Sequence, residues 1–298
     1  MNRHAVLDTL SVVVGSRLVG GHKFFADSVE SAPIGDVVAE SEATLDGIDR
    51  SEVREIPVET PTSDLTVGYR VWQWVGPDAP TVVYHHGNNE DPFDDGRFAT
   101  HTFGTIFHGH GDEVPANVLA VRAPYHTLST RAFARRMGDL ANFTSMLAGS
   151  VAGVDALVRT VREEWASPVV LAGFSLGGWV TNLHRAHHGT AAVYAPMFAG
   201  AALDDLFTES VYRGMVGPAG QAAPERLHEV LNFEERVAEA PTATVRAMLG
   251  QYDRIIRLGP QRRCYDDADL SIVPKGHVTG SLAGDRLRRH VVDAVEGV

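Results

Sequence analysis

The sequence predicts an α/β fold, in which a mainly parallel β-sheet carries helices on both faces. From residue 81 onward, short apolar runs of strand length alternate with helical stretches. The first two predicted strands have no helix between them, so they should pair antiparallel at one edge. The length of 298 residues and the 44% share of hydrophobic residues suit a single large domain of this class.

The first fifty residues are expected to form an N-terminal helical extension. Asp8 interrupts their apolar stretch, which therefore lacks the continuous core of a secretory signal. A Glu-, Asp- and Ser-rich connector runs from about Asp27 to Ser51. The pattern favours an amphipathic helix packed on the domain over a helix on a membrane surface, because it lacks a basic face. The residues at helical spacing are Leu7, Leu10, Val14 and Leu18.

The apolar runs give the order of the strands. Residues 53–59 and 65–75 form a hairpin across the turn at 61–64. The buried strands that follow are expected at 81–85, 118–121, 169–172, 192–194, 245–249 and 270–273.

Helices fall between most of these strands. The longest runs from about Thr130 to Trp165 and would be divided by a break near Gly149 or Gly153. Another follows Gly177, and the last covers residues 282–295. Residues 199–240 are too long for a simple crossover, and we expect them to form a small helical insert, or cap, over the carboxyl edge of the sheet.

One motif carries chemistry. Gly173-Phe174-Ser175-Leu176-Gly177 follows the predicted strand 169–172 and precedes a helix, which is the context of a nucleophile elbow. The serine must occupy a sharp, strained turn so that its hydroxyl projects above the sheet. Glycine at 173 and 177 removes the side chains that would collide with the neighbouring strand and helix.

On this motif the chain resembles the α/β-hydrolase superfamily, in its serine esterase and lipase-like branch, over roughly residues 53 to 298. A His86-Gly87 turn ends the strand at 81–85, as in hydrolases of this fold. The resemblance implies an oxyanion hole made by the backbone N–H groups of Asn88 and Leu176. His85 and His86 are interpreted as groups that hold this loop rather than as catalytic residues.

The resemblance also implies the two partners of Ser175. The acid is expected after the penultimate strand, where Asp253 stands, with Asp204 and Asp205 as rivals after the preceding strand. His277 follows the last strand and is the expected general base. The order Ser175, Asp253, His277 matches that of the fold.

The charge pattern excludes several partners. The formal net charge is −12, which argues against binding to nucleic acid or anionic lipid. The cations comprise 2 lysines, Lys23 and Lys275, and 24 arginines, a bias that suits either a high-salt environment or a GC-rich genome. The histidine clusters at 108–110 and 184–188 lack cysteines or acids at ligand spacing, so we expect no catalytic metal and no cofactor. We expect a cytoplasmic protein without a transmembrane segment; the sequence leaves its oligomeric state open.

The function predicted is that of a serine hydrolase acting on a small-molecule carboxylic ester through an acyl-enzyme. Thioesters and amides are further substrates that this chemistry allows. An acyltransferase, a serine peptidase and a non-catalytic binding protein on the same fold are the alternatives. Apolar residues of the insert would either roof the site or pack the insert onto the domain: Leu206, Phe207, Val211, Tyr212, Met215 and Val216. Trp179 and Tyr125 are candidates for positions near the site.

Overall fold

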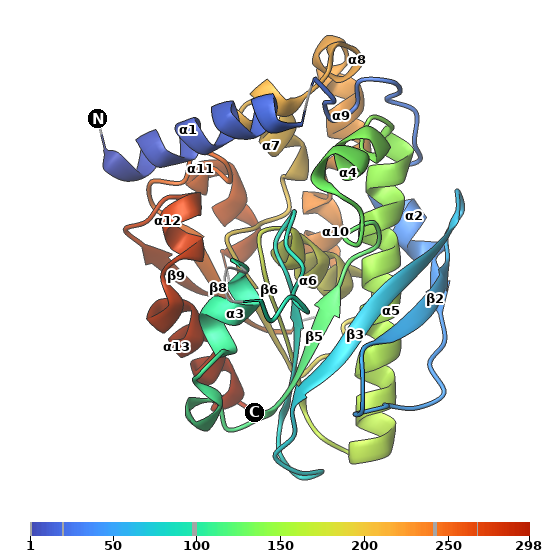
Figure 1. The fold of residues 1–298 in the computed structure, drawn as a ribbon, viewed down its shortest axis with the longest axis vertical. Coiled ribbons are helices and arrows are strands. Elements are labelled where there is room, and N and C mark those ends of the chain that lie inside the picture. The colour runs from blue at the N-terminus through green and yellow to red at the C-terminus, as the bar shows by residue number, and fades with distance from the viewer. Residues whose placement is uncertain (1, 20, 97–99, 241–242, 267) are drawn as a thin grey trace.

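A nine-stranded mixed sheet runs through the computed structural model, which describes residues 2–19, 21–96, 100–240, 243–266 and 268–298 (Figure 1). Its order is β1-β2-β3-β5-β4-β6-β7-β8-β9. The pairs β1–β2, β2–β3 and β3–β5 are antiparallel, and the others are parallel. The predicted mainly parallel sheet with an antiparallel N-terminal edge is confirmed. The strands are β1 (Glu42–Ala43), β2 (Arg54–Glu59), β3 (Asp64–Gln73), β4 (Thr81–His85), β5 (Asn117–Arg122), β6 (Val169–Phe174), β7 (Val193–Met197), β8 (Thr244–Gly250) and β9 (Asp269–Val273).

Helices cover both faces of this sheet, as predicted (Figure 1). The α-helices are α1 (Arg3–Leu18), α2 (Ile34–Ala39), α3 (Thr102–Phe107), α4 (Thr130–Arg136), α5 (Leu140–Trp165), α6 (Leu176–His187), α7 (Leu203–Thr208), α8 (Pro218–Ala222), α9 (Pro224–Leu231), α10 (Glu234–Glu239), α11 (Leu258–Gln261), α12 (His277–Ser281) and α13 (Gly284–Val295). Short 3₁₀ helices are η1 (Gly111–Glu113), η2 (Val211–Met215) and η3 (Arg262–Tyr265).

The apolar core lies in two layers, one on each face of the sheet. Val83 of β4 belongs to the layer beneath α2, α5 and α6, whereas Val82 and Tyr84 belong to the layer beneath α3 and α13. Because both faces are covered, alternate residues of the central strands are equally buried. This explains why these strands read as continuous apolar runs in the sequence.

The long helical stretch is divided, but not at a glycine. α4 ends at Arg136 and α5 begins at Leu140, so the break predicted near Gly149 or Gly153 was wrong. Both glycines lie inside α5. A Cβ at Gly153 would stand 2.9 Å from Cβ of Val67, so glycine here allows the helix to approach β3 closely.

α5 is long and apolar enough to span a bilayer by length and composition. In the structure, 89% of its most apolar 18-residue stretch is buried inside the domain, where the helix packs on the sheet and on α2 and α6. Its apolar character is therefore used in the protein core.

The N-terminal helix forms as predicted, but most of its periodic apolar residues face solvent. Leu7, Leu10 and Val14 are 42%, 54% and 46% exposed, whereas Asp8 is fully buried and Val12 is 7% exposed. The side chain of Leu18 lies outside the described part of the structure. α1 packs on η2 and α12 (Figure 1), so its docking face includes the carboxylate that interrupts the apolar run.

The connector predicted from Asp27 to Ser51 contains regular structure. α2 buries Ile34, Val37 and Val38 against α5 and α6, and β1 adds a strand to the edge of the sheet. The region from Ala199 to Ala240, predicted as an insert, contains α7, η2, α8, α9 and α10.

Candidate functional site

Ser175 occupies a strained turn between β6 and α6. Its φ of 54° and ψ of −109° are unusual for a residue with a side chain. A Cβ at Gly173 would stand 2.4 Å from the backbone of Gly177, and one at Gly177 would stand 2.0 Å from the carbonyl oxygen of His85. The two glycines are thus required by close approach, as the motif predicts. Ser175 stands at the amino end of α6, where the helix dipole favours negative charge.

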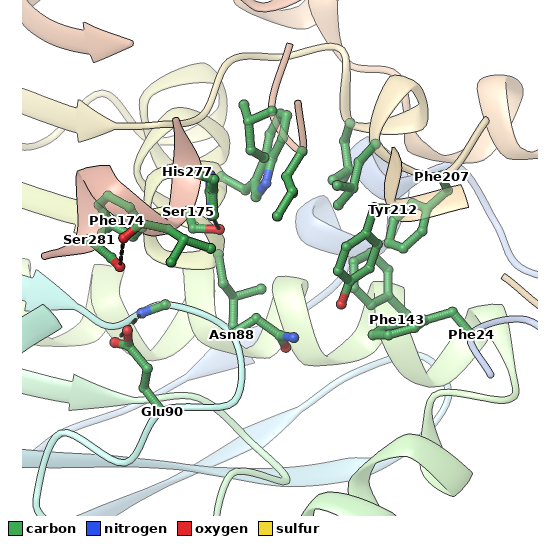
Figure 2. Close-up of a pocket in the computed structure, with 18 residues that line it drawn as sticks. Phe24, Asn88, Glu90, Phe143, Phe174, Ser175, Phe207, Tyr212, His277 and Ser281 are labelled. Atoms are coloured by element: carbon green, nitrogen blue, oxygen red, sulfur yellow. Dashed lines mark hydrogen bonds between the residues drawn. The ribbon is translucent and has the colours of Figure 1, made fainter. Parts of the chain in front are cut away.

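Asp253, His277 and Ser175 form a chain of hydrogen bonds. The Nδ1 of His277 lies 2.8 Å from Oδ2 of Asp253, and its Nε2 lies 3.0 Å from Oγ of Ser175. Because the carboxylate accepts from Nδ1–H, Nε2 is free to accept the proton of the serine hydroxyl. Figure 2 shows Ser175 and His277 side by side. The structure therefore brings together the three residues predicted from sequence.

The Asp253 carboxylate is held in a fixed orientation. Its Oδ1 accepts hydrogen bonds from the backbone N–H groups of Ile255 and Ile256, at 2.8 and 2.7 Å. Burial raises the pKa of Asp253, while the adjacent His277 acts in the opposite direction. Burial lowers the pKa of His277, but the charge and hydrogen bond of Asp253 outweigh it and raise that pKa overall.

The two rival acids are occupied elsewhere. Asp204 binds Nδ1 of His228 at 2.7 Å and Nδ2 of Asn232 at 2.8 Å. Asp205 is paired with the guanidinium of Arg257, whose Nε lies 3.0 Å from its carboxylate. Neither contact involves His277.

Two histidines, His86 and His126, hold the turn after β4. His86 donates from Nδ1 to the carbonyl oxygen of Gly87 and accepts at Nε2 from the N–H of Ala123. The N–H of Asn89 donates to Nε2 of His126. Burial lowers the pKa of His126 to about 4 and lowers that of His86 well below its ordinary value, so both rings are neutral and can accept a hydrogen bond at neutral pH. The loop-holding role predicted for His86 agrees with these contacts.

Glu90 fixes the same turn from the other side. Its carboxylate oxygen Oε2 accepts hydrogen bonds from the N–H of Gly87 at 3.0 Å and from the hydroxyl of Thr102 at 2.7 Å. Burial raises the pKa of Glu90. The N–H groups on either side of Asn88 are thus occupied, one by Glu90 and the other by His126.

Asn88 and Leu176 line the same pocket as Ser175. Leu176 is the first residue of α6, where an N–H group has no partner within its helix. Asn88 lies in the turn between the two occupied amides. Both residues predicted to form the oxyanion hole therefore line the pocket beside Ser175.

A small, mainly apolar pocket of about 240 Å³ adjoins Ser175 (Figure 2). Trp179 lines it, whereas Tyr125 does not and instead lies against Arg136. Of the insert residues, Leu206, Phe207 and Tyr212 face the pocket, while Met215 and Val216 are buried. The other apolar and aromatic lining residues, besides Leu176, are Phe24, Phe143, Phe174, Leu203, Ile255, Ile256 and Val278.

The remaining histidine clusters make local contacts with acids. The structure places Asp155 of α5 with its Oδ1 3.4 Å from Nε2 of His184 and 3.7 Å from Nδ1 of His188. His110 lies 2.8 Å from Glu113. The acid near His184 and His188 comes from a distant helix, so the local spacing on which the prediction was based does not reveal it. Among the described residues, no group of three or more His, Cys, Asp or Glu side chains has the arrangement of a metal site.

Three residues of this site were missed in the sequence. Glu90 and His126 hold the turn after β4, and Asp8 contacts the loop of His277. Glu90 lies close to the His86-Gly87 turn, which could have drawn attention to it. His126 and Asp8 come from other segments, and only the folded chain brings them to the site.

No protein-family model matches the sequence, and no curated protein sequence matches it. Solved structures do resemble it. An esterase from Pyrococcus furiosus aligns with a TM-score of 0.55 and 14% identity, over 86% of this chain and 98% of that chain. Acetyl xylan esterase 1 from Thermoanaerobacterium sp. JW/SL YS485 aligns with a TM-score of 0.53 and 13% identity, over 92% and 98%.

A larger protein shares the same architecture. The acylaminoacyl peptidase of Pyrococcus horikoshii aligns with a TM-score of 0.52 and 13% identity over 82% of this chain. The match spans 40% of the peptidase chain. The strand order, the turn at Ser175 and these structural neighbours lead to one conclusion: the chain has the α/β-hydrolase fold.

Proposed function

We propose that this protein is a serine hydrolase that cleaves small carboxylic esters with a short apolar acyl group. The observation that carries the proposal is the chain Asp253–His277–Ser175, with spacings of 2.8 and 3.0 Å, at the edge of an apolar pocket. The esterases among the structural neighbours support a hydrolase of this kind.

In the proposed reaction, Oγ of Ser175 attacks the carbonyl carbon of the ester while Nε2 of His277 accepts the hydroxyl proton. The backbone N–H groups of Asn88 and Leu176 stabilise the oxyanion. The imidazolium then donates its proton to the departing alkoxide, which leaves an acyl-enzyme. A water molecule attacks this acyl group while Nε2 of His277 accepts one of its protons. The bond from the acyl carbon to Oγ then breaks, the imidazolium returns the proton to Oγ of Ser175, and the carboxylic acid is released. Asp253 stabilises the imidazolium throughout.

The size of the pocket limits the acyl group. The pocket beside Ser175 has a volume of about 240 Å³. This is below the range typical of sites for drug-sized ligands, ~300–1,000 Å³. Its lining by Phe143, Leu206 and Phe207 favours an apolar acyl chain over a charged one.

We therefore expect kcat/KM to be highest for p-nitrophenyl esters with short acyl chains and to fall as the acyl chain lengthens. Leu206→Ala removes side-chain atoms from the pocket wall and should move the optimum to longer chains. Leu227→Ala is the matched control, because Leu227 is fully buried in α9 outside the pocket. A panel of esters of rising chain length checks both. An unchanged profile in Leu206→Ala would show that the acyl chain binds elsewhere.

The pKa of His277 predicts the pH dependence. The base must be neutral to accept the serine proton, and its pKa is raised above the ordinary value of 6.5. We expect kcat/KM to fall on the acid side, with a midpoint above pH 6.5. The measurement is kcat/KM for a short p-nitrophenyl ester across pH, with circular dichroism as a check that the enzyme stays folded. A midpoint below 6.5 would contradict the assignment.

Amide cleavage and acyl transfer use the same first step and form the alternative. The peptidase neighbour makes an amide substrate worth direct comparison. The same acyl group should be offered as a p-nitrophenyl ester and as a p-nitroanilide, each with and without an added alcohol. A higher kcat/KM for the anilide would favour a peptidase, and conversion of the ester mainly to a new ester would favour an acyltransferase.

A further inference from the structure

Asp8, at the centre of α1, makes contacts that bear on the proposed reaction. Its side chain is fully buried, although it belongs to a helix whose neighbouring apolar residues are exposed. Oδ2 accepts from the backbone N–H of His277 at 3.0 Å and from that of Arg254 at 3.1 Å. Oδ1 accepts from the N–H of Val278 at 3.0 Å.

These three amides belong to the two loops that carry the partners of Ser175. Arg254 directly follows Asp253, and His277 and Val278 begin α12. One carboxylate therefore joins the loop of the acid to the loop of the base. The first N–H groups of a helix have no partner within it, so Asp8 provides acceptors that α12 lacks. A buried carboxylate in turn needs such donors in place of water. The carboxylate and the three N–H groups therefore each satisfy the hydrogen-bonding needs of the other.

The absence of a side chain at Gly276 allows the close approach of Asp8. Its φ is −93°, which any residue can adopt, so the turn itself does not require glycine. A Cβ at this position would stand 2.7 Å from Oδ2 of Asp8. Glycine is thus needed at this position for the close approach of the loop to Asp8.

α1 makes a second contact with the same two loops. His4, one turn before Asp8, hydrogen-bonds through Nδ1 to Oγ1 of Thr279 at 2.7 Å. Its ring stacks on that of Tyr252, with centroids 5.7 Å apart. Oγ1 of Thr279 also accepts from the N–H of Gly276. α1 thus clamps both loops through two polar side chains on one face.

We propose that Asp8 is a positioning residue for the reaction, which sets the relative placement of Asp253 and His277 and stabilises the imidazolium by its charge. The proposal rests on the proposed function. Three carboxylates act on His277: Asp253 after β8, Asp8 from α1 and Glu90 after β4. Of these, Asp8 is the one that contacts the backbone of both loops.

The test compares Asp8→Asn with Asp46→Asn, a matched loss of charge at an exposed position far from this contact. With two oxygens serving three amides, an Asn side chain must turn its NH₂ toward at least one N–H donor. We expect kcat for a short p-nitrophenyl ester to fall ~10-fold or more, toward the ~10² that a displacement of about 1 Å costs, with KM within about twofold. The acid limb of kcat/KM should move ~0.5 pH unit lower, because one negative charge near the imidazolium is lost.

Asp46→Asn should leave kcat and the acid limb unchanged. The inference is overturned if Asp8→Asn keeps kcat within twofold of wild type, if KM alone changes, or if kcat falls while the acid limb stays in place. The last outcome would indicate a purely structural residue.

Amide hydrogen exchange on the unmodified protein tests the contact without any substitution. We expect slow exchange at Arg254, His277 and Val278, and rapid exchange at the unprotected rate would overturn the inference. A wild-type protein that hydrolyses no ester and resists fluorophosphonate would instead overturn the proposed function. An active wild type whose three amides exchange freely would overturn the role of Asp8 alone.

Discussion

Replacing Ser175 by alanine is expected to abolish both ester hydrolysis and covalent labelling by a fluorophosphonate. The strained turn presents the hydroxyl to Nε2 of His277 at 3.0 Å, which activates it toward an electrophilic phosphorus or carbonyl centre. In a well-studied enzyme, loss of the serine nucleophile lowers kcat by ~10⁶. The measurements are turnover of a short p-nitrophenyl ester and the mass increase of the protein after labelling.

The fold of the Ser175→Ala variant should be unaffected. The side chain of Ser175 has His277 as its hydrogen-bond partner, and alanine meets the same backbone constraints at φ 54°. We expect the melting temperature to stay within a few degrees of wild type. Ser271→Ala, at an exposed position on β9, is the control and should label like wild type. Undiminished labelling of Ser175→Ala would place the nucleophile elsewhere.

The elbow could be predicted because its requirements are local. Gly173 and Gly177 lie within two residues of Ser175, and the collisions they avoid involve the adjoining strand and helix. The strands could be predicted for a similar reason, since burial on both faces leaves continuous apolar runs such as 81–85. Asp253 and His277 were predicted from the resemblance to the superfamily, which places the acid and the base after the last two strands, here β8 and β9.

The N-terminal helix shows where such prediction ends. Leu7, Leu10 and Val14 have the spacing of a buried stripe, yet the helix packs through His4, Asp8 and Val12. A carboxylate can be buried there only because three amides from residues 254, 277 and 278 converge on it. These partners are more than 240 positions away, so no window of the sequence contains the reason for the burial.

The pocket depends on packing between segments in the same way. Phe24 lines it from the N-terminal region, Phe143 from α5 and Phe207 from α7. These rings contact one another, with centroids 5.3 to 6.0 Å apart. The sequence left open whether the insert covers the site or packs onto the domain. Its residues do both, since Leu206, Phe207 and Tyr212 line the pocket whereas Met215 and Val216 are buried away from it.

The second large effect is expected from Asp253→Asn. In a well-studied triad, the same change lowers kcat by ~10⁴ because the wrong imidazole tautomer is favoured. Here the backbone supplies the reason. The N–H groups of Ile255 and Ile256 require an oxygen at the position of Oδ1, so an Asn side chain must direct its NH₂ toward Nδ1 of His277. Nδ1 then becomes the acceptor, Nε2 carries the proton, and the ring can no longer accept from Ser175.

Asp204→Asn and Asp205→Asn are the matched controls, because both acids follow β7 and neither contacts His277. Asp205→Asn should lower the melting temperature, since it weakens the pair with the guanidinium of Arg257. Its kcat, measured well below that temperature, should stay within a few-fold of wild type. The measurement is kcat for a short p-nitrophenyl ester in all three variants. A mild Asp253→Asn beside a crippling Asp204→Asn or Asp205→Asn would move the acid to the earlier strand, and the hydrogen bond between Asp253 and His277 would then serve only to hold the loop.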